Sequence, residues 1–304
     1  MRYYFAPMEG ITDSIYRQVH HKYFGGVDRY YMPFLSPTMH RCLTHREERE
    51  LPMADSVDFV AIPQVLTKVA EDFLWAAQVC ADRGYDEVNL NLGCPSGTVV
   101  AKSKGSGMLR DCATLERFLD EIYAKTPIKV SIKTRLGMED PAEFANILSI
   151  YNQYPVSELT IHPRVRKQFY SGSVDMDAFT YATENTKIPL CYNGDLTSKE
   201  DIAKFSVDFP QIEAVMIGRG LIGDPGMLAG SNENLAAFVT ELLETYIIAF
   251  GGSRNAMFRM KENWNHITEH FQCDEKLRKR LRKTTDLDEY RLITAEILQT
   301  IPKE

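Results

Sequence analysis

The stretch Val88-Asn89-Leu90-Asn91-Leu92-Gly93-Cys94-Pro95 decides the fold predicted for this chain. Apolar and polar residues alternate up to residue 92, which predicts a β-strand, and the Gly and Pro that follow end it abruptly. The amide of Asn91 and the thiol of Cys94 therefore lie at the carboxyl end of a strand, where parallel α/β sheets and barrels carry their chemistry. If the rest of the chain closes into a barrel, Cys94 is an active-site residue.

Seven further runs of apolar, β-branched or aromatic residues are typical of strands, and segments with helical apolar spacing lie between most of them. All eight predicted strands cover residues 2–7, 30–34, 59–65, 86–92, 128–134, 157–161, 188–192 and 213–217. Alternating units of this number and length predict an α/β fold, a closed (β/α)₈ TIM barrel. An open doubly wound sheet is the weaker alternative, since no GxGxxG motif follows the first strand.

The strand pattern stops near residue 235. Helical spacing then covers residues 235–250, 254–272, 275–283 and 287–299, with Gly251-Gly252 separating the first two helices. We therefore predict a TIM-barrel catalytic domain over residues 1–235 and a small all-helical C-terminal domain over residues 236–304.

The composition limits the possible classes of protein. No run approaches 18 consecutive apolar residues, and no basic segment followed by an apolar one opens the chain, so we expect neither a membrane protein nor a secreted one. The six cysteines form no CxxC pair and no disulfide spacing, which predicts a reduced, cytoplasmic protein. No His/Cys cluster predicts a metal site. The net charge of −7 argues against a generally basic surface that coats nucleic acid.

Polar or glycine-rich clusters follow seven of the eight predicted strands. In chain order they are Ala6-Pro7-Met8-Glu9-Gly10, Pro63-Gln64, Asn91 to Cys94, Lys133-Thr134-Arg135, His162-Pro163-Arg164, Asn193-Gly194-Asp195 and Gly218-Arg219-Gly220. The last two indicate a phosphate site, because glycines let backbone N–H groups approach an anion and Arg219 adds a charged donor. Either cluster alone could be an ordinary turn, but their position at successive strand ends favours phosphate.

Three side chains in these clusters could take part in chemistry. Because side chains alternate between the two faces of a strand, Lys133 is expected to point into the mouth of the barrel. Its ammonium needs an anion there, either a reduced flavin or a structural carboxylate. His162 could donate to a ring carbonyl, although a lone histidine is more often structural. An unperturbed thiol titrates near about 8.5, so Cys94 is mostly protonated at neutral pH and could act as a general acid or as a nucleophile.

Taken together and in this order, the clusters resemble the tRNA-dihydrouridine synthase family. The family signatures stand here as APMEGITD (residues 6–13), NLGCP (91–95), KTRLG (133–137), HPR (162–164) with YSG (170–172), NGD (193–195) and GRG (218–220). The resemblance runs from residue 5 to about residue 225, and a helical tail follows as it does in the family. The first two signatures are highly specific, whereas the others also occur in other flavin barrels. The chain departs from the family at Pro163, where glycine is usual.

The resemblance implies an FMN-bound barrel that reduces uridine in tRNA to 5,6-dihydrouridine, with NADPH reducing the flavin. It implies that Pro7, Met8 and Glu9 line the flavin, that Gln64 and Lys133 bond its ring system, that His162 contacts the ring edge, and that Asn193, Gly194, Asp195, Gly218 and Arg219 hold its phosphate. Cys94 is then the proton donor, and we expect Asn91, Arg164 and Arg166 to contact the RNA. We also expect a monomer without a metal.

The charge of the chain is unevenly distributed. Residues 254–283 contain nine Lys and Arg side chains against four acidic ones, whereas the whole chain is acidic. A basic helical face near the barrel mouth could follow tRNA phosphates, and a solvated helix face is the alternative.

Three other functions remain open on the sequence. One is an FMN barrel that reduces a free pyrimidine, of the dihydroorotate or dihydropyrimidine dehydrogenase type. The second is a non-redox phosphate-binding barrel such as an aldolase or isomerase. The third is a catalytically silent RNA-binding protein with the same fold.

Overall fold

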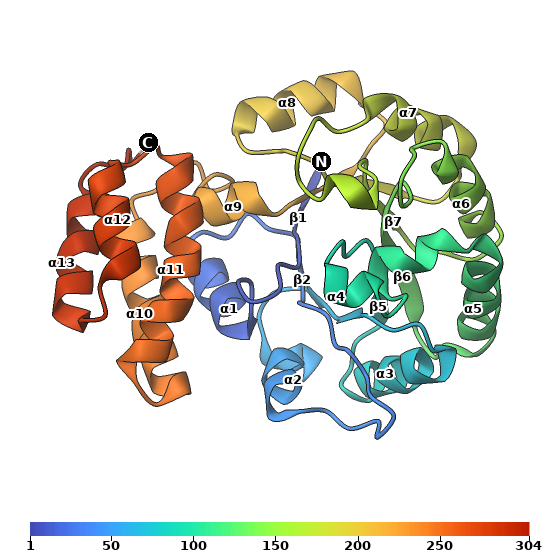
Figure 1. Cartoon of the computed structure of the whole chain (residues 1–304), viewed down its shortest axis with the longest axis horizontal. Coiled ribbons are helices and arrows are strands. Elements are labelled where there is room, and N and C mark those ends of the chain that lie inside the picture. Colours follow the sequence, from blue (N-terminus) through green and yellow to red (C-terminus); the bar gives the residue numbers. More distant parts are fainter. Residues whose placement is uncertain (304) are drawn as a thin grey trace.

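The structure is a computed structural model that describes residues 1–303 of the chain (Figure 1). Nine parallel strands form one sheet in the order β3-β2-β1-β9-β8-β7-β6-β5-β4. They are β1 (Arg2–Phe5), β2 (Arg29–Tyr31), β3 (Ala61–Ile62), β4 (Gln64–Val65), β5 (Glu87–Leu92), β6 (Lys129–Arg135), β7 (Leu159–His162), β8 (Leu190–Tyr192) and β9 (Ala214–Ile217). The strands at the two ends of this order, β3 and β4, follow each other directly in the chain with only Pro63 between them. The sheet therefore closes on itself, and the predicted barrel is confirmed.

The third predicted strand is present in two pieces because Pro63 interrupts it. Proline has no backbone N–H to give to the ladder, although its carbonyl still accepts a 2.8 Å hydrogen bond from the N–H of Asn89 on β5. Strand β3 therefore pairs with β2, and β4 pairs with β5.

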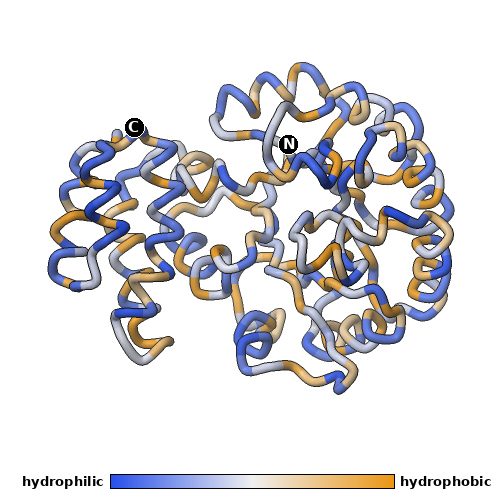
Figure 2. Tube along the Cα trace, viewed as in Figure 1, coloured by the Kyte–Doolittle hydropathy of each residue, from blue (hydrophilic) through white to orange (hydrophobic). Residues whose placement is uncertain are grey.

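Helices and short turns of helix connect the strands and surround the sheet. The α-helices are α1 (Ser14–Tyr23), α2 (His45–Glu50), α3 (Ala70–Asp82), α4 (Gly97–Val100), α5 (Cys112–Lys125), α6 (Glu143–Tyr151), α7 (Met176–Asn185), α8 (Lys199–Asp208) and α9 (Arg219–Gly223), and the 3₁₀ turns are η1 (Ala54–Ser56), η2 (Gly105–Arg110) and η3 (Arg166–Gln168). In α5, Leu115, Leu119 and Ile122 are fully buried at helical spacing. Truncating one of them to alanine would cost about 2–5 kcal/mol. Figure 2 shows the resulting alternation of apolar and polar residues along the outer helices.

Four helices follow the barrel, close to their predicted positions. They are α10 (Leu235–Phe250), α11 (Ser253–His270), α12 (Glu275–Lys283) and α13 (Leu287–Leu298). The break between the first two is at Gly251, whose φ of 67° is a left-handed conformation that glycine adopts readily. Buried residues of these helices belong to the same apolar core as those of the outer barrel helices. The division of the chain into two domains at residue 235 stays a prediction.

Asp13, in the loop after β1, joins the barrel to the C-terminal helices. Its Oδ1 caps α1 by accepting from the N–H of Tyr16 at 3.0 Å, and also accepts from the hydroxyl of Tyr246 on α10 at 2.8 Å. Its Oδ2 lies 3.9 Å from Nε of Arg259 on α11. This carboxylate therefore fixes α10 and α11 beside the carboxyl ends of the strands.

Buried side chains fill the amino-terminal end of the barrel interior. Tyr4 and Tyr31 lie there, and their hydroxyls donate to the carboxylate of Glu158 at 2.9 and 3.2 Å. The carboxyl ends of the strands are thereby left as the open end. In the part of the chain that the structure describes, no helix combines the length and apolar character needed to cross a membrane.

Candidate active site

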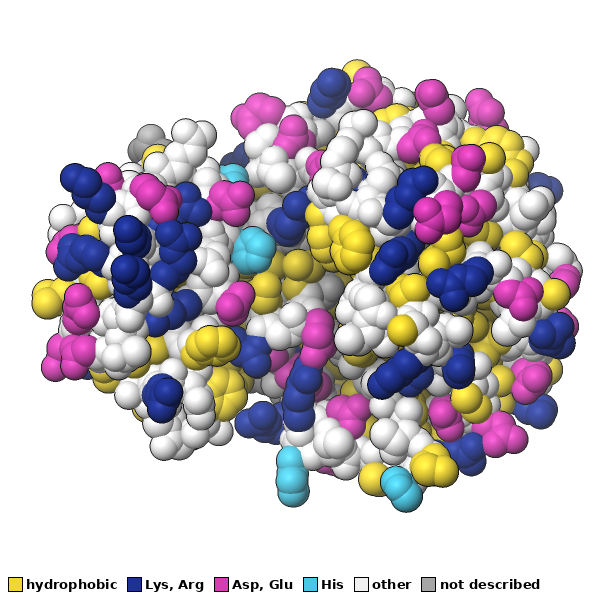
Figure 3. All heavy atoms as spheres, in the orientation of Figure 1, with side chains coloured by type: hydrophobic (Ala, Val, Ile, Leu, Met, Phe, Trp, Pro, Cys, Tyr) yellow, Lys and Arg dark blue, Asp and Glu magenta, His cyan; other side chains and the backbone are white. Residues whose placement is uncertain are grey.

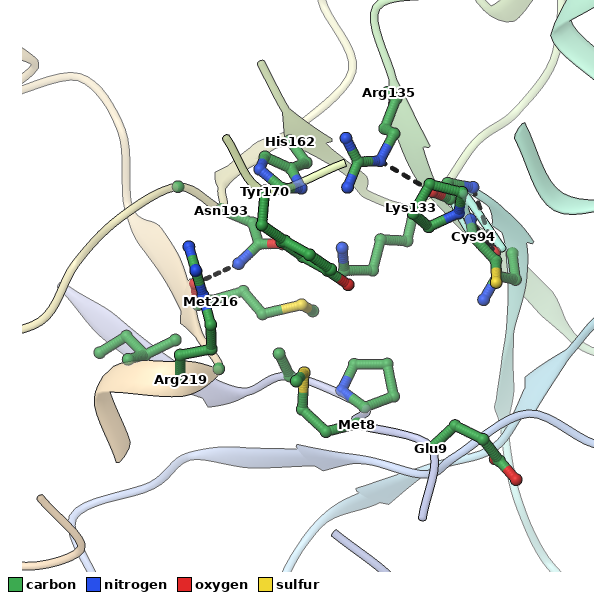
Figure 4. A pocket seen from close by; sticks show the side chains of 18 of the residues that line it. Met8, Glu9, Cys94, Lys133, Arg135, His162, Tyr170, Asn193, Met216 and Arg219 are labelled. Carbon is green, nitrogen blue, oxygen red and sulfur yellow. Dashed lines mark hydrogen bonds between the residues drawn. The ribbon is translucent and has the colours of Figure 1, made fainter. Parts of the chain in front are cut away.

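A cavity opens at the carboxyl ends of the strands (Figure 4). Thirteen of the fifteen residues expected to contact flavin, phosphate or RNA line this active-site cavity: Pro7, Met8, Glu9, Gln64, Asn91, Cys94, Lys133, His162, Asn193, Gly194, Asp195, Gly218 and Arg219. Arg164 and Arg166 do not line it. The residues come from seven separated parts of the chain, because a parallel barrel presents all its strand ends on one face.

A chain of amide hydrogen bonds runs along the wall formed by β4 and β5. Nε2 of Gln64 donates to Oδ1 of Asn89 at 2.8 Å, and Oε1 of Gln64 accepts from Nδ2 of Asn91 at 2.7 Å. Oδ1 of Asn91 in turn accepts from the backbone N–H groups of Gly93 and Cys94 at 3.1 and 2.9 Å. Gln64 and Asn91 each keep one amide N–H for a ligand, since a primary amide carries two.

The segment after Cys94 folds back over it. The hydroxyl and the N–H of Ser106 both donate to the carbonyl of Cys94, at 2.8 and 3.2 Å. Gly105 has a φ of 56°, and a Cβ there would lie only 3.0 Å from Cβ of Cys94, so this approach requires glycine. Burial raises the pKa of the Cys94 thiol, and nearby Arg135 opposes that shift only in part. The thiol is therefore protonated at neutral pH.

Lys133 extends from β6 toward the centre of the cavity (Figure 4). The ladder pairs it with Asn91, so both side chains point to the barrel interior. Burial, together with the charge of nearby Arg135, lowers the pKa of Lys133 to about 8. No acidic side chain within residues 1–303 forms an ion pair with Lys133. A structural carboxylate, one of the two partners that the sequence analysis allowed for Lys133, is therefore not found among these residues. The ammonium faces the cavity instead.

His162 and Arg164 form a fixed pair at the end of β7. Nη1 of Arg164 lies 3.1 Å from Nε2 of His162. Because arginine has only donors, Nε2 accepts and the ring proton is on Nδ1. Burial, followed by the charges of Arg135 and Lys133, holds the pKa of His162 well below its ordinary value. The ring is therefore a neutral donor at pH 7.

The two glycine-containing loops after β8 and β9 meet at Asp195. Its carboxylate accepts from Nη2 of Arg219 at 2.9 Å and from Nη1 of Arg164 at 3.0 Å. Two guanidinium groups around one carboxylate leave a net positive charge beside the backbone of Gly194 and Gly218. Asp195 has a φ of 39°, which non-glycine residues seldom adopt and which is often found at functional sites.

The arginines at 164 and 166 hold loops rather than face the cavity. Arg164 is 1% exposed and also donates to the carbonyl of Gly172, so it lies beneath the site. Nε of Arg166 donates to the carbonyl of Pro95 at 3.3 Å, and its guanidinium lies 5.0 Å from the ring centre of Phe169. Arg166 therefore links the loop after β7 to the turn that carries Cys94.

Two further residues of the cavity had no role predicted from the sequence. Nε of Arg135 donates to the carbonyl of Gly93 at 2.9 Å, and burial lowers the pKa of Arg135 to about 10. The Tyr170 ring lies across the cavity, with Arg135 and Arg219 at 5.4 and 5.0 Å from its centre (Figure 4). Both belong to motifs seen in the sequence, but only their position in space shows that they meet.

Two further features of the site concern possible metal ligands and the position of Glu9. Within residues 1–303, no three His, Cys, Asp or Glu side chains gather closely enough to hold a metal ion. Glu9 lies at the rim of the cavity, where its carboxylate pairs with Arg46 of α2.

Solved structures of other proteins share this barrel fold. Morphinone reductase shares 12% identity, with a TM-score of 0.55 over 75% of this chain and 84% of that chain. The old yellow enzyme homologue from Zymomonas mobilis shares 12% identity, with a TM-score of 0.56 over 74% of this chain and 86% of that chain. At these identities the likeness concerns the fold alone.

Sequence comparisons identify the family. The family model "Dihydrouridine synthase (Dus)" matches residues 4–302. The chain is 30% identical to tRNA-dihydrouridine synthase B of Pasteurella multocida, over 74% of this chain and 67% of that protein. It is also 30% identical to a probable tRNA-dihydrouridine synthase of Rhizobium leguminosarum bv. phaseoli, over 88% of this chain and 84% of that protein. The chain belongs to the dihydrouridine synthase family.

Proposed function

We propose that this enzyme uses FMN and NADPH to reduce the C5–C6 bond of specific uridines in tRNA to 5,6-dihydrouridine. One observation carries the proposal: a single cavity holds the Lys133 ammonium, unpaired by any acid within residues 1–303, together with the protonated thiol of Cys94. The names of the relatives support the same reaction.

The residues of the cavity fit an FMN group by their charge and hydrogen-bonding capacity. Lys133 offers a buried cation to an anionic ring, and His162 and Gln64 each offer an N–H. The excess positive charge of Arg164 and Arg219 over Asp195 suits the phosphate. When bound, FMN would supply the hydride for C6 of uracil and would be reduced again by NADPH.

The protein's own part in the reaction is to orient the base and to supply a proton. Cys94 holds that proton at neutral pH, so it is suited to protonate C5 while C6 receives the hydride. One hydride and one proton convert the double bond to a single bond, and the thiolate regains its proton from solvent. Asn91, as part of the amide chain, fixes the backbone of Cys94 and keeps one N–H for the base. Arg164 acts as a positioning residue that holds His162 and Asp195.

The surface of the C-terminal helices favours tRNA over a free pyrimidine as substrate. Lys276, Lys279 and Lys283 recur at helical spacing on α12 and are exposed; we call them the α12 lysine face. The arginines between them are instead ion-paired, Arg278 and Arg282 with Glu275 and Arg280 with Glu296. Figure 3 shows Lys and Arg gathered over these helices on the side where the molecule is hollowed. A basic surface on the same face of the molecule as the hollow would bind RNA phosphates, which a free pyrimidine lacks.

A base within folded tRNA must turn outward to reach the cavity, at a cost of a few kcal/mol in unstacking. The decisive experiment supplies purified, flavin-loaded enzyme with NADPH and either unmodified tRNA or free uracil and orotate. We expect NADPH oxidation coupled to dihydrouridine in tRNA, and no turnover of the free bases. Turnover of a free pyrimidine alone would show a dehydrogenase of that type. A purified protein without a flavin absorbance spectrum would indicate a non-redox barrel.

A further inference from the structure

A second hollow lies beside the active-site cavity, between the loop after β1 and the C-terminal helices. Its volume is about 600 Å³, within the range of roughly 300–1,000 Å³ typical of small-ligand sites. We call it the loop–helix groove. Its lining consists of residues 9–11 on the barrel side and of Phe250, Asn255, Phe258, Arg259 and Glu262 on the helical side. Glu9 lines both hollows, so the groove continues directly from the rim of the active site.

The groove presents an aromatic ring to solvent. Phe258 is 71% exposed, although most phenylalanine surface in a folded protein is buried. Figure 3 shows hydrophobic side chains on the part of the helical region that borders the hollow. Exposed aromatic rings beside a nucleic-acid site serve as platforms on which unpaired bases stack.

Polar groups flank this ring on the same face of α11. Asn255 and Glu262 lie one turn before and one turn after Phe258, since residues three or four apart share a helix face. Within residues 1–303, the side chains of Asn255 and Glu262 form no hydrogen bond or ion pair. Arg259 is instead held against the barrel, with Nε 3.9 Å from Oδ2 of Asp13. The free polar groups of this face are therefore an amide and a carboxylate.

The charge of the groove selects a base rather than a phosphate. Glu9 is paired with Arg46 and Arg259 with Asp13, so both of these charges are offset. Glu262 has no such partner within residues 1–303 and leaves the groove with a net negative charge. This balance repels RNA phosphates and the phosphates of NADPH. A carboxylate is an acceptor that can take two N–H bonds side by side. Guanine offers such a pair on its Watson–Crick edge, from N1–H and the N2 amino group, whereas uracil offers a single N–H between two carbonyls.

Given the proposed function, we infer that the loop–helix groove binds a second unpaired base of the same tRNA, a guanine. The guanine stacks on Phe258 and directs its Watson–Crick edge to Glu262, while the target uridine occupies the active-site cavity. The α12 lysine face contributes affinity that does not depend on sequence, and the groove adds a base-specific contact that helps to choose which uridine enters the cavity.

The test begins with the protein side, using an unmodified tRNA transcript and the flavin-loaded enzyme. Phe258→Ala is expected to raise the Kd for tRNA about 10- to 100-fold, through the loss of one stacking contact. Glu262→Gln keeps the size of the side chain and should raise the Kd by a smaller factor. Leu292→Ala is the matched control, because Leu292 is 65% exposed on α13 and lies outside the groove. It should leave the Kd unchanged.

The RNA side identifies the base. Each unpaired guanine of the transcript is replaced in turn by inosine, which lacks the N2 amino group. One position should weaken binding to the unsubstituted enzyme and cause no further loss in Glu262→Gln, because coupled changes are not additive. Additive losses at every position, or a Kd for tRNA unchanged in Phe258→Ala, would overturn the inference. A raised KM for NADPH in Phe258→Ala would overturn it too, because the groove would then hold the dinucleotide.

These outcomes separate the groove from the proposed function. An unsubstituted enzyme that forms dihydrouridine, together with variants that bind tRNA equally well, would leave the function intact and reject the groove. An unsubstituted enzyme that forms no dihydrouridine would reject the function, and the groove proposal with it.

Discussion

Asn91 fixes the backbone of Cys94: its Oδ1 accepts the N–H of Cys94 at 2.9 Å while its Nδ2 is bonded to Oε1 of Gln64 at 2.7 Å. The backbone that carries the thiol is thus fixed by a side chain three residues earlier, which is itself held by Gln64 on the neighbouring strand β4. Such an arrangement suits a proton donor, which has to meet one carbon atom of the substrate in a defined geometry.

Replacing Cys94 by alanine tests this role. Cys94→Ala should retain FMN and be reduced by NADPH at the normal rate, but uridine reduction should slow by about 10²–10⁴-fold because the general acid is lost. Stopped-flow absorbance separates the two half-reactions. The control is Cys112→Ala, since Cys112 lies on α5 outside the cavity and should change neither rate. An equal loss of flavin reduction in Cys94→Ala would instead indicate a structural role.

The rate of uridine reduction should decrease at alkaline pH and not at acidic pH. A general acid works while it is protonated, and burial raises the pKa of Cys94 above the ordinary thiol value of about 8.5. With the flavin reduced beforehand, the single-turnover rate should be constant around neutral pH and fall only as the pH rises through that raised pKa. The residual rate of Cys94→Ala should lack this alkaline decrease. If the decrease persisted, it would belong to another group, with Lys133 as the first candidate because its pKa is about 8.

Removing Arg219 should weaken FMN binding. Arg219→Ala leaves Asp195 with Arg164 as its single cation, so the excess positive charge of the cradle disappears. Loss of a charge-assisted hydrogen bond costs about 1.5–3 kcal/mol, or roughly a 10- to 100-fold higher Kd. Flavin absorbance after dialysis measures the occupancy. Arg291→Ala, which removes a similarly exposed arginine paired with Glu244, is the control. Full occupancy in Arg219→Ala would refute the assignment of the phosphate cradle.

The barrel and most of its lining could be predicted because both follow from local patterns. Alternation of polar and apolar residues marks each strand, and in a parallel barrel every strand end faces the same cavity. The split of the third strand at Pro63 is also a local effect, readable from the missing N–H of proline.

Contacts between distant parts of the chain could not be predicted in the same way. Arg164 and Asp195 are separated by 31 residues, and no periodicity links them. Arg164 was therefore expected to contact RNA, whereas the structure buries it under the site. The position of Tyr170 between Arg135 and Arg219 likewise depends on the path of the loop after β7. The basic run was visible in the sequence, but the ion pairs that engage its arginines depend on how α12 packs.

Because the arginines of α12 are ion-paired and its lysines, within residues 1–303, are not, the lysines are the residues to change in a test of tRNA binding. Reversing the α12 lysine face by Lys276→Glu, Lys279→Glu and Lys283→Glu should raise the Kd for tRNA and leave NADPH-dependent flavin reduction unchanged. Affinity for tRNA should fall steeply with salt in the unsubstituted enzyme. The slope of log affinity against log salt concentration should decrease by about 1 for each lysine that contacts a phosphate.

The matched control reverses Lys125, Lys129 and Lys187, which are exposed near the amino ends of the strands, away from the cavity. This triple variant has the same change in net charge and should bind tRNA far better than the α12 variant. Equal effects of the two would mean that total charge matters and that α12 is a solvated helix face. The rim of the barrel would then have to supply the phosphate contacts, with Lys102, Lys104, Arg166 and Lys167 as the next residues to reverse.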